Sequence, residues 1–372
     1  MIPLFRPTFR TEECLQEMKR ALEIGWTGQG FLTEEFESNW SSYTDLSNSI
    51  MLNSASAALH LALESMKIVR NWKPEDEIIS SPLTFVSTNH AILWSGLVPV
   101  LADVDESLCL SVESVEKLVT PKTKGVIFVA IGGNSGRIKE IQEFCSKNGL
   151  AFILDAAHAA GSKLNGEVLG KGADALCYSF QAVKNLPTAD SGMLCLSNNE
   201  EHEVAKKLSW LGISASTFER NTGKGYKWEY NVDYLGYKDN GNSIMAAMGL
   251  VGLKYLDEDN EIRRKIASYY SELLDADQSI SYISHANMKE TSQHIFQVIV
   301  EDRPKVIEAL AKAEIGCGVH YRTNCEYKMY AKFKPTTPNA TKLSEKILTL
   351  PIFLDITRSE QELVIHQILG AK

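Results

Sequence analysis

Short apolar runs alternate with segments of helical periodicity from about residue 50 onward, and this alternation restricts the folds that the chain can adopt. The apolar runs, which we expect to be strands, cover residues 50–52, 77–80, 98–103, 125–130, 150–155 and 175–178. The helical segments between them cover residues 56–66, 85–94, 111–118 and 138–148. Strands that are separated by helices form a mainly parallel sheet with helices on both faces. The sequence therefore predicts an α/β fold built on such a sheet.

The pattern changes beyond residue 243, where two long helices are expected over Ser243–Leu256 and Glu261–Leu274. They are followed by a strand, a helix, two short extended pieces and a last helix, at residues 293–300, 306–313, 318–322, 348–353 and 359–369. This is the content of a small α+β domain. We therefore expect a large domain over residues 1–250 and a small C-terminal domain over residues 251–372. No low-complexity linker separates them, which indicates that the two domains pack tightly.

Composition and charge argue against several classes of partner. The 372 residues carry a formal net charge of -9 with the acids spread along the chain, so no basic surface for nucleic acid is expected. The seven cysteines show no Cys-x-x-Cys pair and no metal-ligand spacing, which favours reduced thiols, a cytoplasmic location and no bound metal. The N-terminus lacks the features of a signal peptide, and no apolar stretch reaches the length of a membrane span. We expect a soluble protein without a membrane partner.

Two strand ends carry chemically useful side chains. Asp155 and His158 follow the run at 150–155, and Ser179 and Lys184 follow the run at 175–178. The carboxyl ends of parallel strands meet at one edge of a sheet, where such folds bind ligands. A lysine amine that can form an imine with an aldehyde, beside a carboxylate that keeps a pyridine nitrogen protonated, is what pyridoxal 5'-phosphate (PLP) requires. A lone lysine would instead be an ordinary surface residue, so the combination carries the prediction.

Further residues could complete a PLP site, although each also has an ordinary structural explanation. Ser56 lies among small residues at the start of an expected helix, where backbone N–H groups and the helix dipole favour a phosphate; it could equally be a helix cap. Ser179 is placed to reach the same phosphate. Phe85 could stack on the pyridine ring or belong to the core. His158 could cover the ring, hold Asp155 or be a buried histidine with satisfied hydrogen bonds.

These pieces, in this order, resemble the DegT/StrS-type sugar aminotransferases, PLP enzymes that aminate keto sugars, usually on a nucleotide carrier. The resemblance covers nearly the whole chain and rests on Gly25–Thr27, Phe31–Phe36, Ser54–His60, Ser81–Thr88, Asp155–Ala159, Ser179–Asn185, Gly236–Asn240, Ala246–Gly249, Gly318–Arg322 and Leu350–Phe353. It implies the fold of the PLP transferases of fold type I, with the segment 1–30 packed near the active site. The Gly236–Asn240 segment is most similar to that of enzymes making 4-amino-4-deoxy-arabinose on uridine diphosphate.

The resemblance also implies roles for individual residues. The catalytic residues would be Lys184, Asp155 and His158. Cofactor contacts would come from Ala55, Ser56, Phe85, Ser179 and Gln181, and from Asn240 of the neighbouring subunit in a homodimer with shared active sites. The sugar side would comprise Trp26, Thr27, Lys238, His320 and Tyr321.

The implied reaction is a ping-pong transamination. Glutamate or glutamine would convert PLP to pyridoxamine 5'-phosphate, which would then aminate a nucleotide-linked 4-keto or 3-keto deoxysugar. The product would serve amino sugar biosynthesis for lipopolysaccharide, O-antigen or a secondary metabolite.

Three departures from the family pattern bear on specificity. Ala130 stands where a histidine is usual, Leu154 replaces an acid, and Asp190–Gly192 replaces Glu-Gly-Gly. Two other functions therefore stay open: a non-catalytic sensor or scaffold, and a PLP enzyme acting on amino acids alone, for which Arg322 could bind the substrate carboxylate. The related sugar dehydratases replace the lysine with histidine, so Lys184 counts against them.

Overall fold

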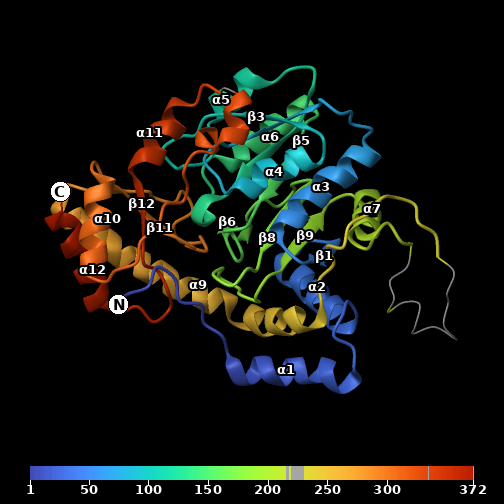
Figure 1. The fold of residues 1–372 in the computed structure, drawn as a ribbon, viewed down its shortest axis with the longest axis horizontal. Helices are drawn as coiled ribbons and strands as arrows, with labels where there is room; N and C mark the ends of the chain where they lie inside the picture. The colour runs from blue at the N-terminus through green and yellow to red at the C-terminus, as the bar shows by residue number, and fades with distance from the viewer. Residues whose placement is uncertain (215–217, 219–229, 334, 372) are drawn as a thin grey trace.

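The computed structural model describes residues 1–214, 218, 230–333 and 335–371, and it confirms the predicted α/β fold (Figure 1). Its large sheet has seven strands in the order β1-β9-β8-β5-β4-β2-β3. Their bounds are β1 (Ser49–Leu52), β9 (Gly192–Leu196), β8 (Ala175–Ser179), β5 (Ala151–Asp155), β4 (Thr123–Val129), β2 (Glu77–Ser80) and β3 (Val98–Leu101). The neighbours from β8 to β3 pair in parallel, whereas β9 is antiparallel to both β8 and β1. The predicted strands all form, and β9, for which no strand was expected, completes the sheet.

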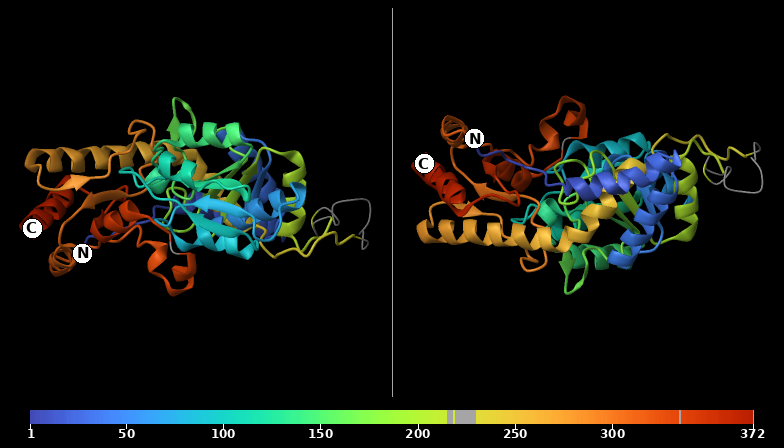
Figure 2. Two further views of the ribbon diagram at one scale, coloured as in Figure 1. Left: turned by 90° about the horizontal axis from the view of Figure 1, so that it is seen from above. Right: turned by 90° about the horizontal axis from the view of Figure 1, so that it is seen from below.

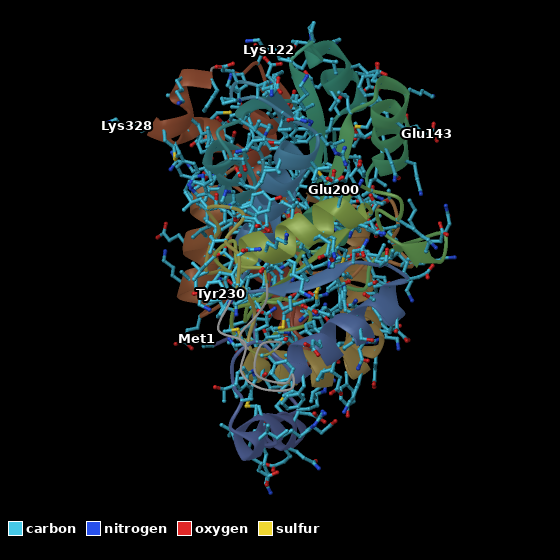
Figure 3. All side chains as sticks on the ribbon, turned by 90° about the vertical axis from the view of Figure 1, so that its right-hand side faces the viewer. Met1, Lys122, Glu143, Glu200, Tyr230 and Lys328 are labelled. Atoms are coloured by element: carbon cyan, nitrogen blue, oxygen red, sulfur yellow. The ribbon has the colours of Figure 1, made fainter. Side chains whose placement is uncertain are left out.

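Helices cover both faces of this sheet because its strands alternate their side chains between two apolar clusters. Phe152 and Leu154 of β5 belong to one cluster and Ile153 to the other. The first cluster is covered by α2 (Phe31–Thr44), α5 (Val112–Leu118), α6 (Ile138–Asn148) and the start of α9 (Ser243–Asp277). The second is covered by α3 (Ala55–Val69), α4 (Val86–Trp94) and α7 (Asn199–Ser209). Exposed charged side chains such as Lys122, Glu143 and Glu200 lie at the outside of these layers (Figure 3).

A second, smaller sheet lies at the other end of the molecule, beside both chain termini (Figure 1). Its three antiparallel strands are β10 (Ser281–Tyr282), β11 (Phe296–Ile299) and β12 (Ile347–Leu350). The helices α10 (Arg303–Lys312), α12 (Arg358–Gly370) and the last turns of α9 share a third apolar cluster with it. The helix α11 (Pro338–Lys346) precedes β12, and the short hairpin of β6 (Lys163–Leu164) and β7 (Glu167–Val168) projects from the large part.

The expectation of two helices between residues 243 and 274 was wrong, because one helix of 35 residues, α9, spans the whole region. It runs from beneath the large sheet to the small one (Figure 2). Two polar residues between the expected helices are buried in contacts: Asp259 pairs with Arg10, and Asn260 bonds to Asn185 and to the carbonyl of Ala160. The division at residue 250 falls inside this helix, and the two-domain description stays a prediction.

The N-terminal segment crosses from the small part to α1 (Thr11–Ile24), which packs along α9. Ile2 forms a parallel bridge with Ile315, and Arg10 makes two 2.7 Å hydrogen bonds to the Asp259 carboxylate. Between these anchors, Phe5 reaches the cavity described below. Among the helices of the described ranges, none combines the length and apolar character needed to cross a bilayer.

Candidate active site

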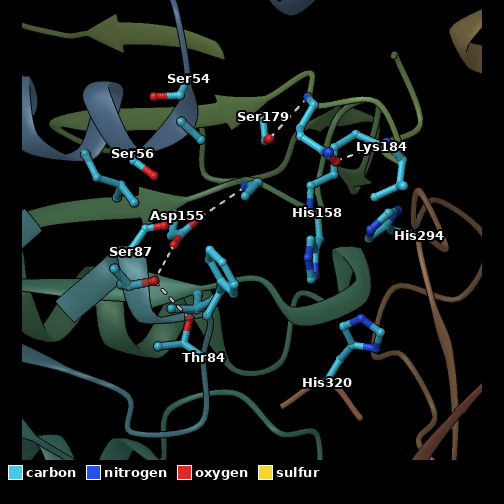
Figure 4. A pocket seen from close by; sticks show the side chains of 18 of the residues that line it. Ser54, Ser56, Thr84, Ser87, Asp155, His158, Ser179, Lys184, His294 and His320 are labelled. Atoms are coloured by element: carbon cyan, nitrogen blue, oxygen red, sulfur yellow. Dashed lines mark hydrogen bonds between the residues drawn. The ribbon is translucent and has the colours of Figure 1, made fainter. Parts of the chain in front are cut away.

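A cavity of about 420 Å³ lies at the carboxyl ends of the parallel strands, between the large sheet and the small part of the chain. Its volume is within the range of small-molecule sites. Figure 4 shows Ser54, Ser56 and Asp155 in one half of it and the rings of His158, His294 and His320 in the other. The cavity therefore has a hydroxyl-rich end and an imidazole-rich end.

Asp155 is the last residue of β5 and is only 5% exposed. The Thr88 hydroxyl donates to its Oδ2 at 2.7 Å, and the Ala157 N–H donates to its Oδ1 at 3.1 Å. Burial raises the pKa of Asp155, while these two donors and the Lys184 amine oppose the rise. A buried carboxylate held by neutral donors is suited to pair with a cationic group of a ligand.

The Lys184 side chain enters the cavity from the turn after β8. In this turn the backbone N–H of Lys184 donates to the carbonyl of Gln181. Its Nζ makes no hydrogen bond within the described part of the chain. Desolvation lowers the pKa of Lys184 to about 8, and the carboxylate of Asp155 limits the decrease. The amine is therefore far closer to the neutral, nucleophilic form than a surface lysine is.

The start of α3 forms the hydroxyl-rich end. Ser54 caps the helix by accepting a 3.1 Å hydrogen bond from the Ala57 N–H, which leaves the N–H groups of Ala55 and Ser56 without acceptors in the helix. The side chains of Ser56 and Ser179 line the same end. Free N–H groups at a helix N-terminus beside two hydroxyls bind a phosphate well.

Gly192 makes this end possible because β9 passes very close to the start of α3. A Cβ at this position would lie 2.6 Å from the backbone nitrogen of Ala55 and 2.7 Å from the carbonyl oxygen of Tyr178. No side chain fits there without moving one of the two backbones. Asp190 and Ser191 depart from the usual Glu-Gly-Gly sequence. Its last glycine is retained as Gly192, where the close backbones leave no room for a side chain.

The substitution Gly192→Ala is expected to destabilise the protein by about 1–3 kcal/mol, the usual effect of overpacking a buried site. Urea unfolding of the PLP-free protein measures this free energy. Gly370→Ala is the matched control, since a Cβ there meets open space. Equal midpoints for the two variants would contradict the close approach seen here.

Aromatic rings form the remaining walls. Phe85 is the residue before α4, and the centroid of its ring lies 5.9 Å from that of Tyr321. The Tyr321 ring also stacks on the His158 ring, with the two centroids 5.9 Å apart. His158 lies 4.5 Å from His294, which Phe5 covers with its ring nearly parallel at 5.7 Å. Burial and the nearby Lys184 amine hold the pKa of His158 well below its usual value, so its imidazole is neutral.

The structure brings together most of the predicted site residues and separates four of them. The residues that line the cavity are Ala55, Ser56, Phe85, Asp155, His158, Ser179, Gln181, Lys184, His320 and Tyr321. Trp26, Thr27, Lys238 and Asn240 do not line it. Trp26 bonds to the Gln29 carbonyl, and Lys238 lies over the Trp210 ring and bonds to Asn240. Roles for these four in this chain's own cavity have no geometric support.

Several cavity residues had no role predicted from the sequence, among them Thr88, Phe5 and His294. Thr88 holds Asp155, and Phe5 and His294 form part of the wall. Thr88 follows Phe85 by three residues in the Ser81–Thr88 motif, and this spacing places both residues near the same helix start. Phe5 and His294 reach the cavity only through tertiary packing, so no local pattern identifies them. Of the three departures expected to affect specificity, Ala130 and Leu154 are buried in the core and do not line the cavity, whereas Asp190 and Ser191 do line it.

These features fit PLP. The buried Asp155 carboxylate would hold the pyridine nitrogen, the start of α3 with Ser56 and Ser179 would hold the phosphate, and Lys184 would reach the aldehyde. Groups of three or more histidine, cysteine or acidic residues that could hold a metal ion do not occur in the described ranges.

Comparisons with known proteins agree with this geometry. The model of the DegT/DnrJ/EryC1/StrS aminotransferase family matches residues 9–369. The spore coat polysaccharide biosynthesis protein SpsC of Bacillus subtilis is 32% identical, over 99% of this chain and 96% of its own length. The sugar aminotransferase CalS13 of Micromonospora echinospora superposes with a TM-score of 0.90 at 25% identity, with 100% of each chain covered. Spr1654 of Streptococcus pneumoniae, solved in a PMP form and a PLP form, reaches 0.91 in the former at 28% identity, over 100% of this chain and 99% of its own.

Proposed function

Since the chain belongs to the DegT/DnrJ/EryC1/StrS aminotransferase family and is a PLP-dependent sugar aminotransferase, we propose that it transfers the amino group of glutamate or glutamine to a keto deoxysugar carried on a nucleotide. The observation that carries the proposal is the joint placement of the Lys184 amine and the Asp155 carboxylate in one cavity with a helix start whose free N–H groups suit a phosphate. The likeness to a spore coat polysaccharide biosynthesis protein supports a place in amino sugar biosynthesis.

PLP, when bound, supplies the electron sink that makes a proton on the substrate's amine-bearing carbon acidic. Lys184 is the base that takes this proton and later returns it. Asp155, held by the Thr88 hydroxyl, would keep the ring nitrogen in its charged form, and Phe85 and His158 would flank the ring. The sugar is placed at the imidazole-rich end, near His320 and Tyr321.

We further propose a homodimer with shared sites. Asn240 and Lys238 lie outside this chain's cavity, yet their backbone segment borders the site: Asn240 bridges to Leu52 at the end of β1, and the Asp239 carbonyl accepts the Asn53 N–H. A segment so close to the hydroxyl-rich end, whose Lys238 and Asn240 side chains do not line this chain's cavity, is suited to serve a neighbouring subunit. Asn240 would then contact the phosphate in the partner.

An enzyme for amino acids alone has less support. Arg322, which would have to bind the substrate carboxylate, does not line the cavity and pairs with Glu326.

The two halves of the reaction test the function. Glutamate or glutamine is expected to bleach the visible absorbance of the PLP-loaded protein, and a nucleoside-diphosphate 4-keto-6-deoxyhexose is expected to restore it and to appear as an amino sugar in mass spectra. The corresponding free keto sugar is the control for the carrier. Restoration by 2-oxo acids but by none of the keto sugars would contradict the proposal.

The uptake of PLP by the PLP-free protein is expected to depend on pH through Lys184. The neutral amine reacts with the aldehyde, so the rate should rise with pH and level off above about 8, where the amine has lost its proton. At pH 7 about one tenth of the amine would be neutral, against well under one thousandth for an ordinary lysine. Stopped-flow absorbance from pH 6 to 10 measures the profile, and a rate still rising tenfold per unit at pH 9.5 would contradict the lowered pKa.

A further inference from the structure

The tautomer of His158 follows from its hydrogen bonds. The N–H of Gly132 points at Nδ1 at 3.2 Å, and because a backbone N–H only donates, Nδ1 has no proton. Gly132 has a φ of +67°, and a Cβ there would lie 3.0 Å from the His285 ring. Only glycine suits this position, and the backbone therefore fixes the direction of the N–H.

The proton of His158 consequently lies on Nε2. The ring is 7% exposed and neutral, so one nitrogen carries a hydrogen, and Nδ1 is excluded. Nε2 lies 3.0 Å from the Tyr321 hydroxyl oxygen. His158 is the donor in this hydrogen bond and Tyr321 the acceptor.

Tyr321 is left with its own proton to donate. Burial raises the pKa of its hydroxyl, which therefore stays protonated, and no second hydrogen bond to it occurs within the described residues. Its ring is fixed between Phe85 and His158, and the side chain lines the cavity. A hydroxyl that accepts a hydrogen bond from His158 cannot donate its own proton back to that nitrogen, so it presents this proton to a group in the cavity.

The neighbouring His294 has the opposite tautomer. The amide nitrogen of Asn185 donates at 2.7 Å to both Asn260 and the Ser292 carbonyl, so its oxygen is the atom that faces Nδ1 of His294, at 2.9 Å. An amide oxygen only accepts, which places the His294 proton on Nδ1. The two adjacent histidines of the cavity wall thus carry their protons on different ring nitrogens. A nitrogen-15 NMR spectrum can distinguish the two tautomers.

We propose that Tyr321 is a positioned hydrogen-bond donor to an oxygen of the acceptor sugar, and that Gly132 and His158 set its direction. The proposal deepens the function proposed above and rests on it. A keto or hydroxyl oxygen accepts such a bond, whereas an ammonium group does not, so the wall favours an oxygen-bearing acceptor at this place.

The hydrogen bonds from Gly132 to His158 and from His158 to Tyr321 form a relay. Nitrogen-15 NMR of the PLP-free protein with labelled histidines tests this relay without any turnover. We expect His158, assigned by its loss in His158→Gln, to be protonated on Nε2, and His294 on Nδ1. The Tyr321→Phe variant should shift the Nε2 signal of His158 and leave the Nδ1 signal of His294 in place. A proton on Nδ1 of His158 would overturn the relay.

Single-turnover kinetics test the role of Tyr321. In Tyr321→Phe, the second-order rate constant with the nucleotide-linked keto sugar should fall about tenfold or more relative to that with glutamate, as for the loss of one buried hydrogen bond. Because a glutamine amide can replace Nε2 and an asparagine amide replaces Nδ1, His158→Gln should retain more of the sugar reaction than His158→Asn. Equal losses in both halves, or equal losses in the His158 pair, would overturn the proposal. A wild-type protein with the expected NMR spectrum that aminates no keto sugar would overturn the proposed function and this role, and not the relay.

Discussion

Replacing Lys184 by alanine is expected to abolish amino transfer and the visible absorbance of the PLP-loaded protein. The variant loses the amine that would form the imine and, with it, the base that we assign to the proton transfer, whose pKa is lowered to about 8. The combined loss should exceed about 10⁴-fold in rate, since proton transfer by a positioned base is alone worth up to about that factor. Product formation by mass spectrometry and the spectrum at equal protein concentration measure the two effects.

Lys147→Ala is the control, because this lysine is 77% exposed and pairs only loosely with Glu143 at 3.9 Å. Turnover by Lys184→Ala within tenfold of this control would show that another group is the base.

The Lys184→Ala variant also tests whether the two subunits share their active sites. If Asn240 serves the partner, co-expressed Lys184→Ala and Asn240→Ala chains should form hybrid dimers with one intact site, and activity should return to a level that neither variant reaches alone.

Replacing Asp155 by asparagine is expected to leave PLP bound but to slow both halves of the reaction by about 10²- to 10³-fold, the usual effect of removing one preorganised electrostatic group. Asparagine keeps the volume but has one acceptor oxygen in place of two, so the variant loses the negative charge and one of the two hydrogen bonds that Asp155 accepts from Thr88 and Ala157. Single-turnover rates with glutamate give the size of the effect, and the retained visible absorbance shows that the cofactor is present.

Thr88→Val separates the charge from its support. This variant removes the 2.7 Å hydrogen bond to Asp155 and keeps the carboxylate, so its rate should fall by about tenfold, as for one hydrogen bond to a charged group. If Asp155→Asn slowed the reaction no more than Thr88→Val does, the carboxylate would have only a structural part.

The sequence predicted the sheet and the cofactor end of the site well because both depend on local patterns. Asp155 and Ser179 end neighbouring parallel strands, and this adjacency follows from the order of strands and helices. The imidazole-rich end was harder to foresee. His294 and Phe5 come from segments that meet the site only after the small part has packed. Two helices were expected where α9 is continuous, because the burial of Asp259 and Asn260 depends on tertiary contacts that a local pattern does not show.

The separation of Trp26, Thr27, Lys238 and Asn240 from the cavity has a different cause. Each was assigned from the likeness of a motif, which preserves the residue and not the chain that it serves. For Asn240 the likeness itself assigned the residue to the neighbouring subunit.

The continuous helix α9 has a consequence for how the cavity accepts ligands. Its first turns pack beneath the large sheet, and its last turns pack on the small sheet, next to which His294 and His320 lie. An unbroken helix bends only gently, whereas a loop at residues 257–260 would have allowed the two walls to swing apart. The continuous helix therefore fixes the distance between the two ends of the cavity. A sugar of different bulk must be accommodated by a different side chain in the cavity wall, for example in place of Phe5, and not by a hinge motion.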